Sequence, residues 1–490
     1  MAEDKALFQV RLDKRLALEE KGVDPYPTRF DRRHDAAEVA GRFDELNAGG
    51  EEVSLAGRLM TVRRMGKASF AHLQDRSGRI QLYFRKDIVG EDAYDTWKKI
   101  EPGDLVGVRG VPLLTKTGEK SIEVRSFEVL AKSLRPLPEK WHGLTNKETR
   151  YRQRYVDLIV NPDVAEVFAR RAALVRSIRA FLDRRGFLEV ETPVLQPIYG
   201  GASARPFVTH HNALDMKLYL RIADELYLKR LIVGGLEKVY EIGKDFRNEG
   251  IDRTHNPEFT QLELYQAYTD FRGMMELFAE MLRTAAMDLH GKTEITFGGR
   301  TADLGNPWKE LSFVDALSER LGADVMAMEE GALRAACAER DIDVPGDASR
   351  GAMMNELFET LVEPSIDSPT FVTDYPKEIS PLAKENPRRA GVVERFEPFL
   401  FGMEVGNAFS ELNDPLEQRA RFEAQQELRG AEREEAQQVD EDYLRALEFG
   451  MPPTGGLGMG IDRIAMILTD QPSIRDVLLF PQLRPETTEP

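Results

Sequence analysis

The sequence predicts an α+β protein with more than one domain, in which a small β-barrel precedes a larger domain of strands and helices. The chain has 490 residues, which exceeds one typical hydrophobic core, so at least two domains are expected. Between residues 53 and 131, apolar and polar residues alternate, as they do in half-buried strands. After residue 150, apolar residues recur mainly at intervals of three or four, which is typical of amphipathic helices.

The composition is that of a globular protein in water. Hydrophobic residues make up 42% of the chain and charged residues 31%, which are ordinary values for this class. The chain contains no run of about 18 apolar residues, and its first residues lack the apolar core of a signal peptide. A cytoplasmic protein with no membrane partner is therefore expected. The single cysteine, Cys337, excludes an internal disulfide and a cysteine-based metal cluster.

Residues 1–50 are expected to form amphipathic helices, because charged residues alternate with leucine and alanine up to Gly49 and Gly50. The barrel is expected over residues 51–135, with about five short strands. Turn-forming residues near Gly78 and Gly118 separate these strands.

The outer face of the predicted barrel combines positive charge with aromatic residues. The net charge of −17 repels nucleic acid overall, but residues 57–86 contain eight basic residues, among them Arg63, and one acid. If Ile80 points inward, its neighbour Gln81 points outward, as does Phe70 on the preceding strand. Such a surface can stack unpaired bases while basic side chains hold the nucleic-acid backbone. The alternative is that Phe70 belongs to the barrel core.

A basic linker with two prolines is expected over residues 136–150, followed by the second domain over residues 151–490. A long helix is predicted between Val164 and Leu182, and Phe187–Pro193 is then expected to form a strand that the proline stops. The next strands are expected at 218–222 and 239–242, and the next helices over 271–289 and 314–361.

Residues 246–265 concentrate charged side chains suited to a nucleotide and an amine. This stretch is predicted to form two short strands joined by a polar loop. Arg247 offers a planar set of donors for a phosphate or a carboxylate, and Glu249 and Glu263 offer acceptors beside it. The alternative is a surface hairpin whose charges are simply solvated.

A second group of candidate residues lies later in the chain. A turn near Gly402 brings Glu397 roughly opposite Glu404, and paired carboxylates with little histidine nearby favour a hard ion such as Mg²⁺. The alternative for each glutamate is a structural salt bridge. Three alternating residues share one face if this segment is a strand, namely Asn407, Phe409 and Glu411.

Three segments resemble the signature motifs of class II lysyl-tRNA synthetases of the bacterial type. GFLEVETP at 186–193 resembles motif 1, FRNEG with HNPEFTQLELY at 246–265 resembles motif 2, and GLGMGIDR at 456–463 resembles motif 3. NAFSELND at 407–414 resembles a run that is specific to the lysine enzymes. The resemblance extends over nearly the whole chain.

The resemblance implies an antiparallel catalytic sheet flanked by helices, an N-terminal OB-fold that binds the anticodon, and a homodimer formed through motif 1. It implies activation of L-lysine with ATP and Mg²⁺, and transfer of the lysine to tRNA-Lys. The implied catalytic residues are Arg247 and Arg463. The implied ATP-binding residues are Arg247, Glu249, His255, Phe259 and Arg463. The implied lysine-binding residues are Gly201, Glu225, Glu263, Tyr265, Asn407, Phe409 and Glu411. The implied metal ligands are Glu397 and Glu404, and the implied anticodon-binding residues are Arg63, Phe70 and Gln81.

The chemistry of the reaction agrees with these residue types. A cationic side chain requires carboxylates in its pocket, and adenylate formation requires positioning and charge neutralisation rather than a protein nucleophile. Among the positions that depart from the family pattern are Asp224, which replaces a common proline, and Met403, which replaces a common basic residue.

Two alternative functions stay open at the level of the sequence. A related enzyme that attaches lysine to a protein would lack the barrel. A catalytically silent RNA-binding paralogue would have lost a motif arginine or a metal glutamate.

Overall fold

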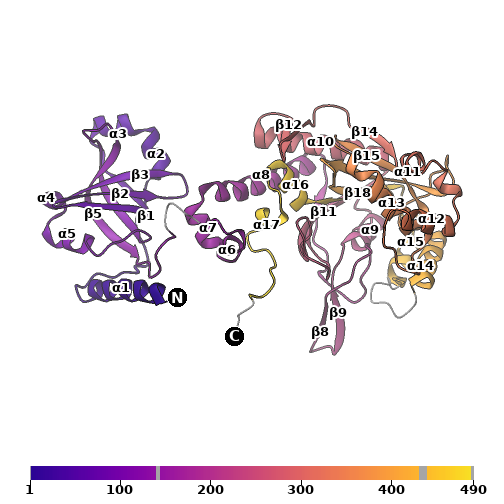
Figure 1. Cartoon of the computed structure of the whole chain (residues 1–490), viewed down its shortest axis with the longest axis horizontal. Coiled ribbons are helices and arrows are strands. Elements are labelled where there is room, and N and C mark those ends of the chain that lie inside the picture. Colours follow the sequence, from indigo (N-terminus) through magenta and orange to yellow (C-terminus); the bar gives the residue numbers. More distant parts are fainter. Residues whose placement is uncertain (1, 139–143, 430–438, 487–490) are drawn as a thin grey trace. The chain divides into compact units, whose positions relative to one another are not determined.

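The computed structural model describes residues 2–138, 144–429 and 439–486, and the chain divides into two compact units, Met1–Thr145 and Asn146–Pro490 (Figure 1). Part of the predicted basic linker, residues 139–143, lies outside the described residues.

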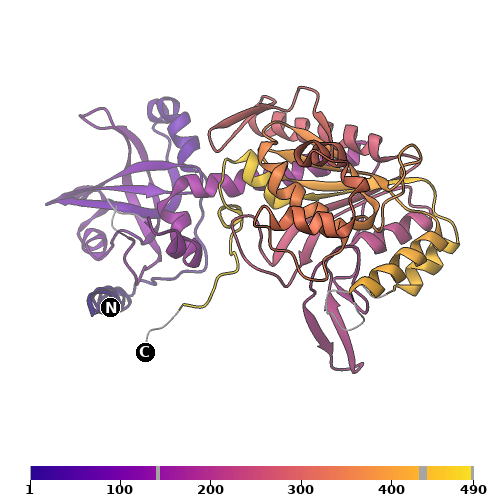
Figure 2. The ribbon, with the colours of Figure 1, turned by 45° about the vertical axis from the view of Figure 1, so that its right-hand side comes forward.

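The first unit contains a closed five-stranded barrel in the order β1-β2-β3-β5-β4, which confirms the predicted fold of this region. Its strands are β1 (Val53–Met65), β2 (Ala68–Gln74), β3 (Arg79–Arg85), β4 (Leu105–Leu114) and β5 (Lys120–Ala131). Its helices are α1 (Ala2–Glu19), α2 (Ala36–Gly41), α3 (Phe43–Gly49), α4 (Lys86–Val89) and α5 (Glu91–Trp97). Helix α1 lies at one end of the barrel, and α2 and α3 lie at the opposite end (Figures 1 and 2).

The interior of the barrel is filled by the apolar face that the alternation predicts. The side chains without exposed surface include Leu55, Leu82, Phe84, Val108 and Ile122. Phe84 stacks on Trp97 of α5, with ring centroids 3.6 Å apart. Phe70 lies on the opposite face from the buried Ala71 and is half-buried, so the alternative that Phe70 belongs to the barrel core is wrong.

The second unit is built on a nine-stranded, mainly antiparallel sheet in the order β14-β15-β16-β18-β19-β11-β10-β6, with β17 paired to β16. Its strands are β6 (Leu188–Glu189), β10 (Lys238–Phe246), β11 (Glu258–Ala267), β14 (Lys309–Ser312), β15 (Thr370–Pro376), β16 (Val392–Leu400), β17 (Met403–Glu404), β18 (Gly406–Ser410) and β19 (Thr454–Gly460). Strands β10 and β11 form the predicted hairpin, so Arg247 is the first residue of the loop that joins them.

Smaller sheets and helices surround this central sheet. The three-stranded sheet of β7 (Leu195–Gln196), β8 (Val208–His211) and β9 (Met216–Leu220) projects from the unit (Figures 1 and 2). Strands β12 (Glu294–Phe297) and β13 (Arg300–Asp303) form a hairpin. The helices of the first half are α6 (Lys147–Arg152), α7 (Arg154–Val160), α8 (Pro162–Arg184), α9 (Glu225–Val233) and α10 (Phe271–His290).

The helices of the second half are α11 (Phe313–Leu321), α12 (Glu330–Ala338), α13 (Arg350–Leu361), α14 (Pro415–Arg429), α15 (Glu441–Glu448), α16 (Ile461–Leu468) and α17 (Ile474–Val477). Short 3₁₀ turns lie at Val325–Ala327, Glu363–Ser365 and Lys377–Ile379. Among the described residues, no helix is both long enough and apolar enough to cross a membrane.

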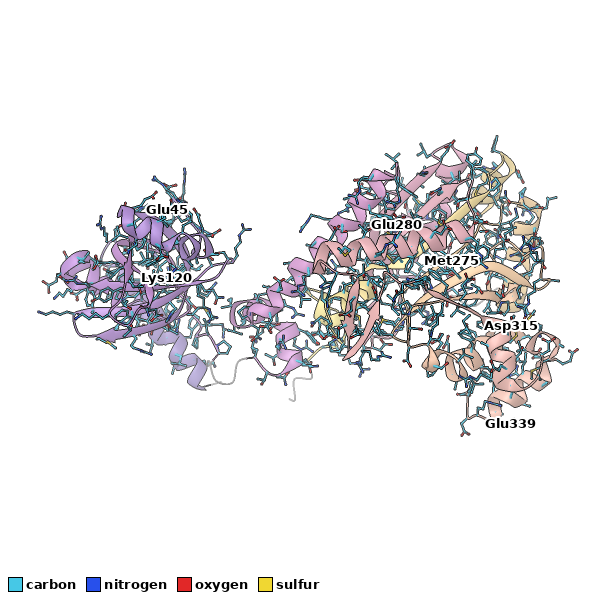
Figure 3. All side chains as sticks on the ribbon, turned by 90° about the horizontal axis from the view of Figure 1, so that it is seen from above. Glu45, Lys120, Met275, Glu280, Asp315 and Glu339 are labelled. Atoms are coloured by element: carbon cyan, nitrogen blue, oxygen red, sulfur yellow. The ribbon has the colours of Figure 1, made fainter. Side chains whose placement is uncertain are left out.

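The two faces of the central sheet bury separate hydrophobic cores. Leu264 packs with α8, α10 and α16 on one face, whereas its neighbour Tyr265 packs with α9, α11 and α13 on the other. Helix α10 covers the first face: Met275 is buried there, while Glu280 forms an ion pair with Arg185 at the surface (Figure 3). The face of Tyr265 is the face on which the candidate site is built.

The predicted strand over Phe187–Pro193 is wrong in extent, because the strand β6 covers Leu188–Glu189. This strand lies at the edge of the sheet and pairs in parallel with β10. Beyond it, the N–H of Thr192 donates to a side-chain oxygen of Glu241 at 3.0 Å instead of to a backbone carbonyl. The ladder therefore ends before Pro193 is reached.

Candidate active site

A cavity of about 890 Å³ lies over β11, β16, β18 and β19, and its wall is completed by α13 and by the loop between β10 and β11. The cavity is lined by every residue predicted to bind ATP, lysine or a metal ion, with the exception of Gly201. The neighbours Ala202 and Ser203 line it instead. Residues that are more than 200 positions apart in the sequence thus meet in one pocket.

One end of the cavity carries cationic and aromatic side chains. The guanidinium carbon of Arg247 lies 5.0 Å from the centre of the Phe259 ring, and Arg247 Nε donates a long hydrogen bond of 3.4 Å to the carbonyl of Ile222. A ring and a guanidinium in this arrangement can stack a purine and hold a phosphate.

Arg463 connects the loop of the hairpin to the acidic side of the cavity. Its Nη1 donates to a side-chain oxygen of Glu404 at 2.9 Å, and its Nη2 lies 2.9 Å from Nε2 of His255. His255 is held in turn by Asp252, whose Oδ2 lies 2.7 Å from Nδ1. The predicted phosphate-binding residues and one predicted metal ligand therefore contact one another directly.

Four carboxylates interact electrostatically with one another near Arg463, namely those of Glu359, Glu363, Glu397 and Glu404. The sequence pattern identified only Glu397 and Glu404. Glu397 accepts a hydrogen bond of 2.6 Å from the Tyr375 hydroxyl. Burial, followed by Glu359, Glu397 and Glu404, raises the pKa of Glu363 to about 8. These are oxygen donors of the kind that Mg²⁺ prefers, and a divalent cation would relieve their mutual repulsion.

Another part of the cavity wall is acidic and almost fully buried. Glu411 is 1% exposed, and its Oε1 has no hydrogen-bond partner among the residues that the structure describes. Tyr265 donates its hydroxyl to Glu263 Oε2 at 2.8 Å, and Gln261 donates its amide to Glu263 Oε1 at the same distance. Oε1 of Glu411 can therefore accept a hydrogen bond from a ligand.

Gly201 lies next to Glu225, which lines the cavity. Its φ of +88° is in the left-handed region, where a side chain is strained. A Cβ at this position would lie 3.0 Å from the Ala223 Cβ and 3.2 Å from the Glu225 Cβ. The backbone of Gly201 therefore approaches Glu225 as closely as only glycine permits.

Lys229 is a residue of this region that the sequence pattern did not identify. Its side chain has no exposed surface, and its ammonium donates to Glu225 Oε1 at 2.5 Å and forms an ion pair with Glu411 Oε2. In the sequence, Lys229 is one of many lysines on amphipathic helices, and only its spacing of four residues from Glu225 could have drawn attention to it.

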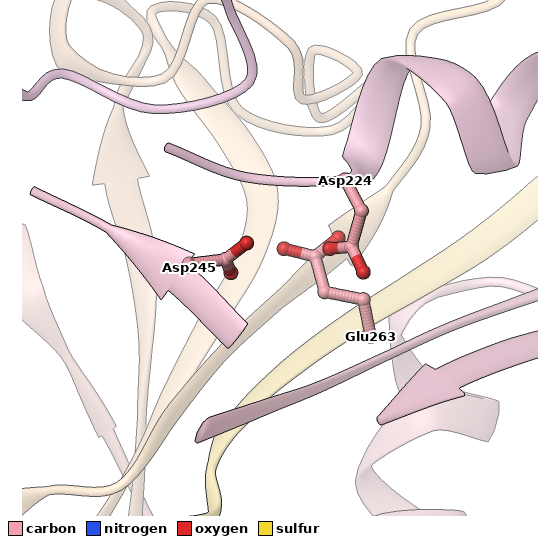
Figure 4. A group of neighbouring side chains, drawn as sticks. All are labelled: Asp224, Asp245 and Glu263. Atoms are coloured by element: carbon pink, nitrogen blue, oxygen red, sulfur yellow. The ribbon is translucent and has the colours of Figure 1, made fainter. Parts of the chain in front are cut away.

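Asp224, Asp245 and Glu263 bring their carboxylates together (Figure 4), with one oxygen of each within 4.8 Å of the others, and Glu263 is the member that lines the cavity. Arg221 faces this cluster, and its Nε lies 3.2 Å from Asp245 Oδ1, although no described group hydrogen-bonds either Asp245 oxygen. Burial, together with Asp245, raises the pKa of Asp224 well above its usual value, and burial raises the pKa of Asp245 to about 6. The departure at Asp224 thus places an additional carboxyl group behind the pocket wall rather than inside the cavity.

The Asp224→Asn variant is expected to be more stable than the parent protein by about 1–3 kcal/mol at pH 8. A carboxyl whose pKa is higher in the folded than in the unfolded state binds its proton more tightly when folded. The parent protein therefore loses stability as pH rises from about 4, the unfolded value, through 6 and above.

Urea unfolding of both proteins at pH 4, 6 and 8 measures this difference. The gain in the free energy of unfolding of Asp224→Asn should be small at pH 4 and should increase as the pH rises. Asp367→Asn, which removes an exposed carboxylate paired with Arg300, serves as the control and should change stability by less than about 1 kcal/mol. A gain that is equal at all three pH values would contradict the expectation.

The barrel of the first unit carries the three residues predicted to bind an anticodon. Arg63 and Phe70 are cross-strand neighbours, and the Phe70 ring stacks on Tyr83 at 4.7 Å. Gln81 lies in the next row and is 8% exposed, and the hydroxyl of Ser121 donates to its Oε1 at 2.6 Å. The three side chains therefore share one outer face, although Gln81 is more enclosed than alternation alone predicts.

Comparisons with known proteins agree with the division into two units. Residues 146–484 match the family model described as tRNA synthetases class II (D, K and N), and residues 53–130 match the model of the OB-fold nucleic acid binding domain. The chain is 56% identical over 482 residues to the lysine–tRNA ligase of Moorella thermoacetica, with 98% of each chain covered. It is 54% identical to the enzyme of the same name from Enterococcus faecalis, with 97% of each chain covered, and 52% identical to that of Bacillus subtilis, again with 97% covered.

Proposed function

The chain belongs to the class II tRNA synthetases of the D, K and N group, and on this premise we propose that it activates L-lysine with ATP and transfers the lysine to tRNA-Lys. The observation that carries the choice of lysine is the buried carboxylate of Glu411, whose Oε1 faces the cavity without a hydrogen-bond partner among the described residues. A substrate ammonium satisfies this carboxylate. A neutral side chain would leave this buried oxygen without a partner, which is unfavourable.

The remaining pocket residues each bind a different part of the lysine substrate. Glu225 and the backbone of Gly201 receive the α-ammonium, and Asn407 meets the α-carboxylate. Phe409 and Tyr265 flank the aliphatic part of the side chain, with Glu263 supporting the Tyr265 hydroxyl. Both ends of lysine and its methylene chain thus find partners of matching polarity.

Adenylate formation is an in-line attack of the lysine carboxylate on the α-phosphorus of ATP, with pyrophosphate as the leaving group. Arg247 holds the α-phosphate and the carboxylate together, which lowers their mutual repulsion as the new bond forms. His255 and Arg463 hold the distal phosphates, and Phe259 stacks on the adenine beside Glu249. The enzyme supplies position and positive charge, and no covalent enzyme intermediate is required.

Mg²⁺ is the metal ion that this site would use. Glu397 and Glu404 would hold it, and when bound it neutralises phosphate charge. The crowding that raises the pKa values of Glu397 and Glu363 by burial and by neighbouring carboxylates supports this assignment. Met403 provides no charge here, and Arg463 forms an ion pair with Glu404.

The experiment that tests the function is ATP–pyrophosphate exchange with each of the 20 amino acids, followed by charging of tRNA. Exchange should require lysine, and lysine should be transferred to tRNA-Lys. Preference for another amino acid would overturn the proposal. Charging of a protein in place of tRNA would favour the alternative ligase, and absence of exchange would favour the silent paralogue.

Phe70→Ala is expected to weaken charging of tRNA-Lys by about tenfold while leaving pyrophosphate exchange unchanged, since one base–aromatic stack is lost. The KM for tRNA in the charging assay measures the loss. Leu16→Ala removes a large exposed apolar side chain from helix α1, which carries none of the three predicted anticodon-binding residues, and serves as the control. Equal loss in charging and exchange would mean that Phe70 acts through the fold.

A homodimer and a cytoplasmic location complete the proposal. Large apolar side chains in and beside the motif 1 segment are exposed, namely Leu188, Val194 and Leu195. A second copy of the chain would cover them. Sedimentation of the protein at micromolar concentration measures the oligomeric state, and a monomer would contradict this part of the proposal.

A further inference from the structure

A buried ammonium lies directly behind the wall of the proposed lysine pocket. Lys229 follows Glu225 by one turn of α9, and its side chain has no exposed surface. Its ammonium contacts Glu225 and Glu411, both of which line the cavity, whereas Lys229 is not among the described residues that line it. The protein has therefore placed its own lysine ammonium against the carboxylates proposed to bind the ammonium groups of the substrate.

The ammonium of Lys229 is held tightly between Glu225 and Glu411. Burial alone would lower the pKa of Lys229, but Glu225 and Glu411 together raise it above its usual value. The ammonium also lies 5.3 Å from the centre of the Phe409 ring and 6.0 Å from that of Tyr265. A charged group surrounded in this way stays charged and has little freedom to move, because any displacement would leave a buried charge unpaired.

The ammonium occupies one oxygen of each glutamate and leaves the other. At Glu225 it binds Oε1, while Oε2 lies 3.7 Å from where a Cβ of Gly201 would be. At Glu411 it contacts Oε2, while Oε1 has no hydrogen-bond partner among the described residues. Both remaining oxygens belong to carboxylates whose rotation is blocked by the same ammonium.

We propose that Lys229 is a positioning and specificity-determining residue, which fixes Glu225 and Glu411 so that each presents one oxygen to one ammonium group of the substrate. The inference rests on the proposed function and deepens it. Without a fixed cation, the two carboxylates would repel each other and would turn or take up protons. The pocket would then lose both its affinity for lysine and its penalty against amino acids that lack the ε-ammonium.

Two substitutions test the proposal in pyrophosphate exchange. Lys229→Met removes the charge at similar length, and is expected to raise the KM for lysine at least tenfold while the KM for ATP stays within about twofold. The preference for lysine over norleucine, which has the same chain length without the ε-ammonium, is expected to fall tenfold or more. Lys229→Arg keeps a cation and is expected to recover part of both losses.

Lys132 provides a matched control in the first unit. It is also fully buried and also bridges two carboxylates, those of Asp104 and Glu101. Lys132→Met should lower the melting temperature and leave the KM for lysine and the preference over norleucine unchanged. Exchange by the parent protein with lysine tests the proposed function separately, so failure there and failure of the role of Lys229 are distinct results.

Three results would overturn the proposal. The first is a folded Lys229→Met protein with an unchanged KM for lysine and an unchanged preference over norleucine. The second is an equal rise of the KM values for lysine and ATP, which indicates a purely structural role. If Lys229→Met does not fold, Lys229→Gln is tested in its place, because glutamine keeps a hydrogen-bond donor without the charge. The third result is a Lys229→Gln protein whose kinetics with lysine match those of the parent protein.

Discussion

Replacing Arg247 by alanine is expected to reduce lysine-dependent pyrophosphate exchange by about 1,000-fold, because one preorganised cation is lost where negative charge accumulates in the transition state. Arg247 is the first residue after β10, and its guanidinium points into the cavity above Phe259. The hydrogen bond of 3.4 Å to Ile222 is long, so the guanidinium is weakly engaged by the protein. Removing it should therefore cost little folding stability.

The measurement is the exchange rate at saturating lysine and ATP, with thermal melting to verify the fold. Arg247→Lys should recover only part of the activity, because a point charge cannot hold a phosphate and a carboxylate in one plane. Arg253→Ala is the matched control: this arginine lies in the same loop, donates to the carbonyl of Pro472, and should be dispensable within about twofold. Near-normal exchange by Arg247→Ala would refute the role of Arg247.

The sequence predicts the surfaces of the fold well where periodicity is strict. Alternation in the barrel separates the buried Ile80 from Gln81 and Ala71 from Phe70, because a strand has only two faces. Alternation cannot predict which side chains cover the outer face of a strand. Gln81 is accordingly less exposed than expected, and Ser121 on β5 hydrogen-bonds to it. Similarly, Phe187–Pro193 has the composition of a strand, but the length of the strand depends on which backbone groups of its partner β10 are available for hydrogen bonds.

The candidate site is predictable in its residue types and less so in its electrostatics. Arg247, Glu397 and Glu411 are unusual in their local sequence, and resemblance to a family assigns them roles. Lys229 lies on an amphipathic helix and Glu363 begins the short 3₁₀ turn after α13, and charges are expected at the surface in both places, so nothing in the local pattern distinguishes these residues. Their importance arises only when the chain folds and brings them against carboxylates far apart in sequence, and local pattern alone does not predict that.

Gly456→Ala is expected to raise the KM for lysine by about 100-fold, because a methyl group is placed where two pocket side chains meet. Gly456 pairs with Tyr265 on one side of β19 and with Phe409 on the other. A Cβ at this position would lie 2.0 Å from Glu411 Oε1 and 2.6 Å from a ring carbon of Tyr265. Both atoms belong to side chains, so the strand can persist while the carboxylate and the ring are displaced.

Gly460→Ala makes the same change on the same strand, and its Cβ would meet atoms of Arg463 at an ordinary 3.8 Å. Its KM for lysine and its melting temperature should therefore stay close to those of the parent protein. The comparison isolates the volume beside Glu411 from any general effect of alanine in β19. If Gly456→Ala bound lysine as well as the parent protein, the ε-ammonium could not depend on the position of Glu411, and the carboxylate that selects lysine would have to be sought among Glu225 and Glu263.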